Sequence, residues 1–153
     1  MLAYLELLLR WNSAYNLTAV RDPMQMVTRH LLDSLAVAPF LAGERVIDVG
    51  TGAGLPGIPL GILDPRRRFH LLDSSGKRTR FLFQVKTALR LDNIVVHRAR
   101  VETFRPEEAY DASVRDPVVA SIGGWSLRAG EVEPGERYGR FRATVVLVPG
   151  AEP

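Results

Sequence analysis

The sequence predicts an α/β fold built on a parallel, doubly wound sheet. Short apolar runs of strand length at 45–49, 68–73 and 94–98 alternate with segments of helical periodicity. A glycine-rich turn follows the first run and leads into a helix. Alternation of this kind calls for parallel strands joined by right-handed crossovers. At 153 residues the chain is long enough for one domain with its own core.

Two helices are expected in the first 40 residues, ahead of the sheet. Apolar side chains recur every three or four residues over 3–15. The pair Asp22-Pro23 then marks a helix start, with an N-cap oxygen followed by proline at the first helical position. We expect this second helix to run to about Ala38.

The central elements follow a βαβαβ order. They are a strand at 45–49, a helix at 56–63, a strand at 68–73, a helix from Ser74 or Ser75 to about Arg90 and a strand at 94–98. A fourth strand is expected at 110–114, then a short helix near 125–129 and a strand near 140–148. We predict a single domain of residues 1–153, with the helices of 1–40 packed on an α/β core of 41–153.

Composition excludes several classes of function. The chain has no cysteine, so it has no disulfide, thiolate metal site or cysteine nucleophile. No apolar run approaches the roughly 20 residues of a membrane span. These features favour a cytoplasmic protein without a membrane partner. The sequence also offers no group of ligands at a spacing typical of a metal site.

Positive charge is concentrated in one segment. The net charge is +3, but residues 65–105 hold 11 Lys/Arg and 3 Asp/Glu, a local net charge of +8. A surplus of this kind suits a polyanionic partner such as RNA or DNA. The alternative is a basic surface that only keeps the protein soluble.

The glycine-rich turn matches two nucleotide-binding patterns. Gly52-Ala-Gly54-Leu-Pro-Gly57 fits the dinucleotide fingerprint, and Asp73 lies 21 residues after Gly52, where a ribose-binding acid is expected. Asp48-Val-Gly50-Thr-Gly52-Ala-Gly54 also fits the first motif of class I S-adenosylmethionine methyltransferases. A pyrophosphate needs a helix N-terminus, whereas a sulfonium cation and its amino-acid group favour a carboxylate such as Asp48. The acid before the first glycine favours the methyltransferase interpretation, although the loop itself could also satisfy Asp48.

Several further sequence segments resemble one family. They are Arg10-Trp-Asn12, Tyr15-Asn-Leu-Thr-Ala-Val20, Arg29-His-Leu-Leu-Asp-Ser-Leu35, the run from Asp48 to Pro59, Leu71-Leu-Asp-Ser74, Gly76-Lys-Arg78 and Arg80-Phe-Leu82. Over about residues 8–112 the chain resembles the bacterial RsmG (GidB) family, whose members methylate N7 of a guanine in 16S ribosomal RNA with S-adenosylmethionine. The resemblance implies a Rossmann-like class I methyltransferase fold with an N-terminal helical layer.

The resemblance also implies roles for individual residues. The cofactor would contact Asp48, Gly50, Thr51, Gly52, Gly54, Asp73, Ser74, Val101 and Glu102. RNA, or the rim of the site, would contact Lys77, Arg78, Arg80 and His30, the last of which lies one helical turn from Asp33. The residue types fit the chemistry, because guanine N7 carries an exposed lone pair and needs no general base. The implied partner is 16S ribosomal RNA or the small ribosomal subunit, met by a monomer.

The sequence departs from the family beyond about residue 113. The family has a Ser-Arg-Ala-Phe-like segment after the fourth strand, whose arginine borders the active site. Arg115 is its counterpart here, in a register shifted by one or two residues, and would position the substrate. The chain looks shortened at the N-terminus and altered or truncated after this point. A degenerate relative that binds RNA or cofactor without turnover is therefore an alternative function, and a nicotinamide-dependent oxidoreductase is a more distant one.

Overall fold

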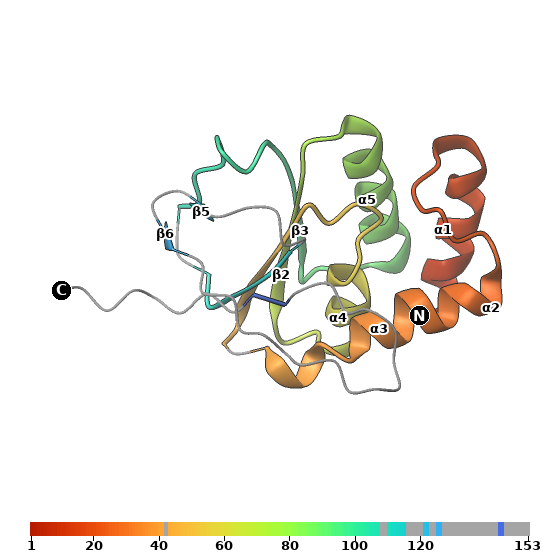
Figure 1. The fold of residues 1–153 in the computed structure, drawn as a ribbon, viewed down its shortest axis with the longest axis horizontal. Coiled ribbons are helices and arrows are strands. Elements are labelled where there is room, and N and C mark those ends of the chain that lie inside the picture. The colour runs from red at the N-terminus through yellow and green to blue at the C-terminus, as the bar shows by residue number, and fades with distance from the viewer. Residues whose placement is uncertain (42, 108–109, 116–120, 123–124, 127–143, 146–153) are drawn as a thin grey trace.

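A five-stranded sheet forms the centre of the protein (Figure 1). The computed structural model describes residues 1–41, 43–107, 110–115, 121–122, 125–126 and 144–145. The strands are β1 (Arg45–Val49), β2 (Arg68–Asp73), β3 (Ile94–Arg98), β4 (Ala112–Arg115) and β7 (Thr144–Val145), in the order β3-β2-β1-β4-β7. The first four are parallel, as predicted, whereas β7 pairs antiparallel with β4.

The strand order places a topological switch point at β1. Its two neighbours in the sheet are β2 and β4. Strands β2 and β3 lie on one side of β1, and the chain then crosses to the other side to form β4. Open α/β sheets bind ligands beyond the carboxyl ends of the strands at such a point. The glycine-rich turn begins directly after β1 and therefore lies there.

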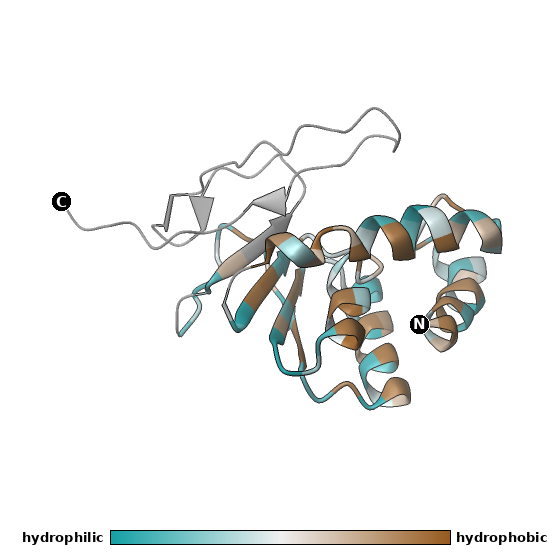
Figure 2. Cartoon of the chain, turned by 90° about the horizontal axis from the view of Figure 1, so that it is seen from below, coloured by the Kyte–Doolittle hydropathy of each residue, from teal (hydrophilic) through white to brown (hydrophobic). Residues whose placement is uncertain are grey.

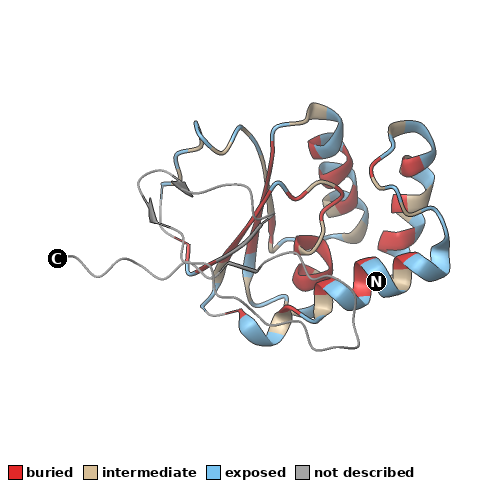
Figure 3. Ribbon diagram, viewed as in Figure 1, coloured by how far each residue is buried: buried red, intermediate tan, exposed pale blue. Residues whose placement is uncertain are grey.

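Two helices cover one face of the sheet. They are α4 (Gly57–Leu63) and α5 (Gly76–Leu89), and they lie on the same side in Figure 1. Their buried residues meet the strand residues of that face, which include Val46, Phe69 and Leu71. Figure 3 shows the buried positions gathered on the strands and on the sides of the helices that face them. Hydrophobic residues follow the same distribution in Figure 2.

The N-terminal helices pack outside this layer. Helix α1 (Leu2–Tyr15) lies against α5, where Trp11 meets Phe81 with ring centroids 5.6 Å apart. Asn16, in the left-handed conformation, ends α1. The predicted N-cap of the next helix is confirmed, because the Asp22 carboxylate accepts the Met24 amide at 2.9 Å.

The second N-terminal helix is less regular than predicted. It consists of α2 (Pro23–Met26), a π-helical stretch η1 (Val27–Leu32) and α3 (Asp33–Leu35), and a separate 3-10 turn η2 (Ala38–Phe40) follows. In the π-helical part the Asp33 amide donates to the Thr28 carbonyl, five residues back. The regular helix therefore ends three residues before the expected limit at Ala38.

The described part of the other sheet face carries no helix. A smaller apolar cluster of Ile47, Val49, Leu72 and Tyr110 lies there, partly covered by side chains of the connection from β3 to β4. Asp111, in that connection, accepts the amides of Glu44 and Arg45 at 2.7 and 2.9 Å. The doubly wound topology is thus present as strand order, while only one of its two helical layers is seen among the described residues.

Three polar rings sit on this second face. His70 Nδ1 and His97 Nε2 are 2.8 Å apart, and the Tyr110 hydroxyl is 3.2 Å from the same His70 nitrogen. His70 Nε2 is buried and has no hydrogen-bond partner among the described atoms. Burial, with the nearby His97, Arg45 and Arg68, lowers the pKa of His70 from 6.5 to about 4. The cluster is therefore neutral at physiological pH.

The C-terminal strands differ from the expected elements. Strand β4 begins at Ala112, two residues later than predicted. The expected helix near 125–129 is wrong at its start, because Trp125–Ser126 forms strand β6 and pairs with β5 (Ser121–Ile122). Residues 127–129 lie outside the described residues, as does most of the strand expected near 140–148. No helix in the described ranges is long and apolar enough to cross a membrane.

We predict that His70 makes stability depend on pH. Its folded pKa of about 4 lies below the ordinary value of 6.5, so the unfolded chain binds the proton first. The free energy of unfolding should therefore fall as pH falls from about 6.5 to 4. In His70→Asn, whose amide can replace Nδ1 but does not titrate, that slope should become shallower in urea titrations. An unchanged slope would show that another group carries the pH dependence.

Candidate functional site

The turn after β1 needs glycine at three alternate positions. Gly50, Gly52 and Gly54 have φ angles of +73°, +59° and +88°. Any other residue in this left-handed region costs about 1–2 kcal/mol. The backbone amides of Gly50 and Thr51 both donate to the Leu72 carbonyl, at 2.8 and 3.2 Å. The end of β2 therefore holds the first half of the turn.

The glycines differ in what surrounds them. A Cβ atom on Gly54 would lie 2.4 Å from Ile58 Cγ1, and one on Gly57 would lie 2.2 Å from Leu71 Cδ2. Those two glycines allow the turn and α4 to pack closely on the core. A Cβ atom on Gly50 would meet nothing within 4 Å, and one on Gly52 only the Gly50 carbonyl at 3.8 Å. These two glycines thus face open space, which leaves room for a ligand beside the backbone.

Asp48 is a buried carboxylate at the carboxyl end of β1. Its Oδ2 atom accepts the Thr51 hydroxyl at 2.6 Å and the Gly57 amide at 2.9 Å. The interpretation in which the loop itself satisfies Asp48 is confirmed for this oxygen. Burial raises the pKa of Asp48 to about 7, against the effect of the two hydrogen bonds, and the charge of Asp73 adds to the rise.

Asp73, at the end of β2, joins three elements. Its Oδ2 atom accepts the Gly52 amide at 3.0 Å, and its Oδ1 atom accepts the Ser75 amide at 2.8 Å. Arg78 adds an ion pair of 3.4 Å from α5. Ser75 is the N-cap residue of α5, as predicted, but its side chain makes no capping hydrogen bond. The carboxylate of Asp73 instead holds the backbone amide of Ser75 itself, directly before the helix.

A buried tyrosine supports the turn from the N-terminal layer. The Tyr4 hydroxyl donates to the Ala53 carbonyl at 2.8 Å. Sequence reasoning missed Tyr4, because it looks like one more apolar position of the first helix. The signal that the sequence offered was a hydroxyl group within a strongly apolar run.

Other predicted site residues lie around this edge of the sheet. Ser74, Lys77 and Arg80 are exposed, near the start of α5. Glu102 is exposed as well, while Val101 packs against the cluster on the second sheet face. Arg115 is the last residue of β4, and its backbone pairs with Val49 at the carboxyl end of β1.

His30 is not exposed, as direct contact with RNA would require. Its side chain is buried, and Nε2 is 2.9 Å from the Thr18 hydroxyl. Burial lowers its pKa, so the ring is favoured in its neutral form. Asp33 is exposed on the same helix. The structure therefore gives His30 a packing environment, and a role in contacting RNA stays a prediction.

Among the described residues, a pocket lies away from the turn. It has a volume of about 300 Å³ and lies at the amino edge of the sheet, lined by Leu41, Leu60, Arg67 and Phe69 among others. It is at the opposite end of the strands from Asp48 and Asp73. No group of three or more His, Cys, Asp or Glu side chains in the described ranges is placed to hold a metal ion.

Comparison with known proteins places this geometry in a family. The family described as "rRNA small subunit methyltransferase G" (GidB) matches residues 1–118. A relative from Ectopseudomonas mendocina, named "Ribosomal RNA small subunit methyltransferase G", is 64% identical over 113 residues, which is 72% of this chain and 53% of the relative. A relative of the same name from Pseudomonas syringae pv. syringae is 53% identical over 134 residues, 86% of this chain and 63% of the relative. The chain spans about half to two thirds of the length of these relatives.

Solved structures agree on the fold. Coclaurine N-methyltransferase, bound to N-methylheliamine and SAH, superposes with a TM-score of 0.54 at 17% identity, over 77% of this chain and 35% of that one. Mitomycin 7-O-methyltransferase MmcR superposes with a TM-score of 0.51 at 20% identity, over 64% of this chain and 29% of that one. At such identities the likeness shows the methyltransferase fold alone. The match over residues 1–118 shows more: the chain belongs to the GidB family of small-subunit ribosomal RNA methyltransferases.

Proposed function

We propose that this chain binds S-adenosylmethionine and transfers its methyl group to N7 of a guanine in 16S ribosomal RNA. One observation carries the proposal. In a member of this family, Gly50 and Gly52 face open space beside two buried carboxylates, Asp48 and Asp73. Partly anionic surroundings of this kind suit a cationic ligand.

The hydrogen bonds of the turn argue against a dinucleotide. A pyrophosphate needs free amides at a helix start. Here the Gly52 amide donates to Asp73 and the Gly57 amide to Asp48. The amides of Gly54 and Ile58 donate to carbonyls within the turn. Four amides of the turn and of the start of α4 are thus already used, two of them by the carboxyl groups of Asp48 and Asp73.

The same groups fit S-adenosylmethionine. An ionised carboxylate has about four acceptor positions, and in Asp73 three are taken by Gly52, Ser75 and Arg78. One position remains for a ribose hydroxyl, and movement of the exposed Arg78 would free a second. We assign Asp48, Gly50, Thr51, Gly52 and Gly54 to the methionine and ribose side of the cofactor. Ser74, Val101 and Glu102 are assigned to the side of the adenine.

The chemistry asks little of the protein beyond alignment. Bound S-adenosylmethionine supplies an electrophilic methyl group, and guanine N7 supplies a lone pair. The chain has no cysteine for a covalent mechanism. It also lacks the Asp/Asn-Pro-Pro-aromatic motif of amino-group methyltransferases. Positioning and electrostatics can therefore supply most of the catalysis, and we assign the positioning of the guanine to Arg115, whose backbone pairs with Val49 at the carboxyl end of β1.

The RNA would approach along the start of α5. Lys77, Arg78 and Arg80 are exposed there, next to Asp73, and they belong to the segment with a net charge of +8. Phosphate contacts of this type fix the register of RNA on the protein. We propose that the chain acts as a single-domain monomer in the cytoplasm, on 16S ribosomal RNA or the small ribosomal subunit.

A second candidate is a relative that binds cofactor or RNA without turnover. It is supported by the end of the family match at residue 118 and by relatives of at least 60% identity that align over only 113–115 residues. Isothermal titration with S-adenosylmethionine and methyl transfer to undermethylated small-subunit RNA separate the two. Binding with transfer supports the main proposal, and binding without transfer supports the second. No binding at millimolar cofactor contradicts both for the cofactor site.

We predict that two glycines of the turn fail in different ways when substituted. Gly52→Val should leave the protein folded, at a cost of about 1–2 kcal/mol from its φ of +59°, and abolish cofactor binding, because the side chain enters the open space. Gly54→Val should mainly lower the Tm, because its side chain collides with Ile58 and Leu82. Titration calorimetry and thermal unfolding measure the two effects. Normal cofactor binding by folded Gly52→Val would show that the turn is not the site.

We predict that cofactor affinity depends on pH through Asp48. Its pKa of about 7 in the free protein should fall when a cation binds nearby, so binding releases a proton below pH 7. The affinity for S-adenosylmethionine should therefore drop about tenfold from pH 8 to pH 6. S-adenosylhomocysteine, whose sulfur is neutral, should show a smaller change. Asp48→Asn should remove the dependence, and an equal slope in wild type and variant would contradict this role.

A further inference from the structure

We propose that Tyr4 is a positioning residue that holds the glycine-rich turn in its cofactor-binding shape from the N-terminal helix. The inference rests on the proposed function of the turn and adds a residue that touches no substrate. It makes cofactor affinity depend on α1, an element outside the α/β core. The contact in question is the hydrogen bond from the Tyr4 hydroxyl to the Ala53 carbonyl.

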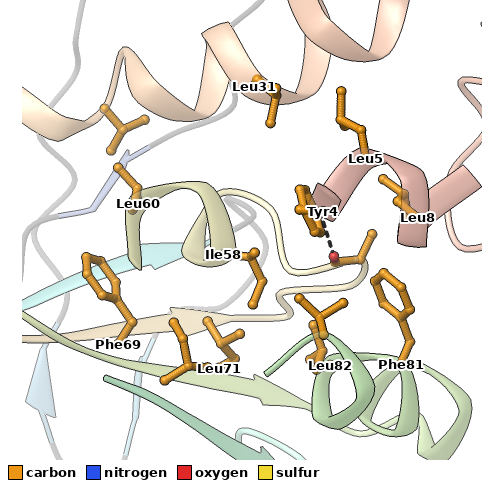
Figure 4. Close-up of a cluster of buried hydrophobic side chains, with 14 of the residues drawn as sticks. Tyr4, Leu5, Leu8, Leu31, Ile58, Leu60, Phe69, Leu71, Phe81 and Leu82 are labelled. Atoms are coloured by element: carbon orange, nitrogen blue, oxygen red, sulfur yellow. Dashed lines mark hydrogen bonds between the residues drawn. The ribbon is translucent and has the colours of Figure 1, made fainter. Parts of the chain in front are cut away.

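The contact is short, buried and remote in sequence. The two atoms are 2.8 Å apart and their residues are separated by 49 positions. Tyr4 is fully buried and Ala53 is 5% exposed. Figure 4 shows the tyrosine ring reaching from α1 to the turn, above Ile58 and Leu82. A polar group at such a position is held by its partner, because water cannot replace the hydrogen bond.

Ala53 is the point of the turn that most needs an anchor. It stands between Gly52 and Gly54, the residues with the greatest backbone freedom. The preceding part of the turn is held by Leu72 and Asp73, and the following part by Asp48 through Gly57. All three of these supports come from β1 and β2. Tyr4 supplies a support between them from a separate layer.

The tyrosine is suited to act as a permanent donor. Burial, and the charge of Asp48, raise its pKa well above the ordinary value of 10, so the hydroxyl stays protonated. The helix that carries it packs against α5, where Trp11 contacts Phe81. The hydrogen bond therefore fixes the direction of the Ala53 carbonyl. It also restrains the backbone of Gly52 and Gly54 on either side of Ala53.

The test compares two variants of α1 in the full chain. Tyr4→Phe removes only the hydroxyl. Leu8→Val, on the same buried face, removes one methylene from a side chain that has no hydrogen-bonding group and serves as the control for packing in α1. Thermal unfolding shows whether the two variants are comparably destabilised. Affinity for S-adenosylmethionine is then measured by titration calorimetry, and amide exchange is followed residue by residue without cofactor.

The expected result separates positioning from packing. Tyr4→Phe should weaken cofactor binding about fivefold, which corresponds to the loss of one neutral hydrogen bond. It should also speed exchange of the Gly52 and Gly54 amides while β2 is unchanged. Leu8→Val should lower the Tm with neither effect.

Two results would overturn the inference. One is normal cofactor affinity in Tyr4→Phe while the wild type binds. The other is a loss of affinity in both variants that follows their Tm, which would mark Tyr4 as a packing residue only. If the wild type itself binds no cofactor, the proposed function fails, and faster exchange confined to the turn in Tyr4→Phe still decides whether Tyr4 positions it. Unchanged exchange would then overturn the inference as well.

Discussion

The hydrogen bond from the Gly52 amide to the Asp73 carboxylate is the interaction on which the site depends. It joins the turn after β1 to the end of β2, and the other oxygen of the same carboxylate accepts the amide of Ser75, the residue before α5. This is possible only in the observed register, where Val49 lies beside Leu72 and the first amides of the turn reach the Leu72 carbonyl. A shift of one residue would turn Asp73 to the other sheet face. Strand pairing therefore sets the geometry of the ligand site directly.

The charges of this edge are arranged in two zones. Asp48 and Asp73 are buried behind the turn, at 2% and 4% exposure, and burial together with the charge of Asp73 raises the pKa of Asp48. The exposed side chains of Lys77 and Arg80 lie outside, at the start of α5. An acidic interior suits a small cationic cofactor, and a basic rim suits a large anionic polymer. Under the proposed function, one protein edge would bind two ligands of opposite charge without competition between them.

The fold was predictable from the sequence because its signals are local. The run 45–49, the glycine turn and the helix start at Asp22-Pro23 each depend on neighbouring residues, and the structure confirms all three. The residue roles that were missed depend on contacts with residues that are remote in the sequence. Tyr4 acquires its role from Ala53, and His30 is buried against Thr18. No periodicity or motif contains such contacts.

The residues of the candidate site were predictable from the sequence, but their contacts were not. The identities of Asp48 and Asp73 follow from motif spacing, but their hydrogen bonds do not. That Gly50 and Gly52 face open space while Gly54 and Gly57 face the core could be known only from the folded chain. The C-terminal expectations relied on isolated Gly and Pro signals without periodicity, and the expected helix at Trp125 proved to be a strand for this reason.

The Asp111 carboxylate has a consequence for how the chain can vary. It binds the amides of Glu44 and Arg45, while its own amide donates to the Arg45 carbonyl, so β4 is locked to β1 at its first residues. The pairing of β4 with β1 is therefore fixed by residues that precede position 115. These three hydrogen bonds use no residue beyond Arg115, so this junction between β4 and β1 does not depend on the sequence that follows β4.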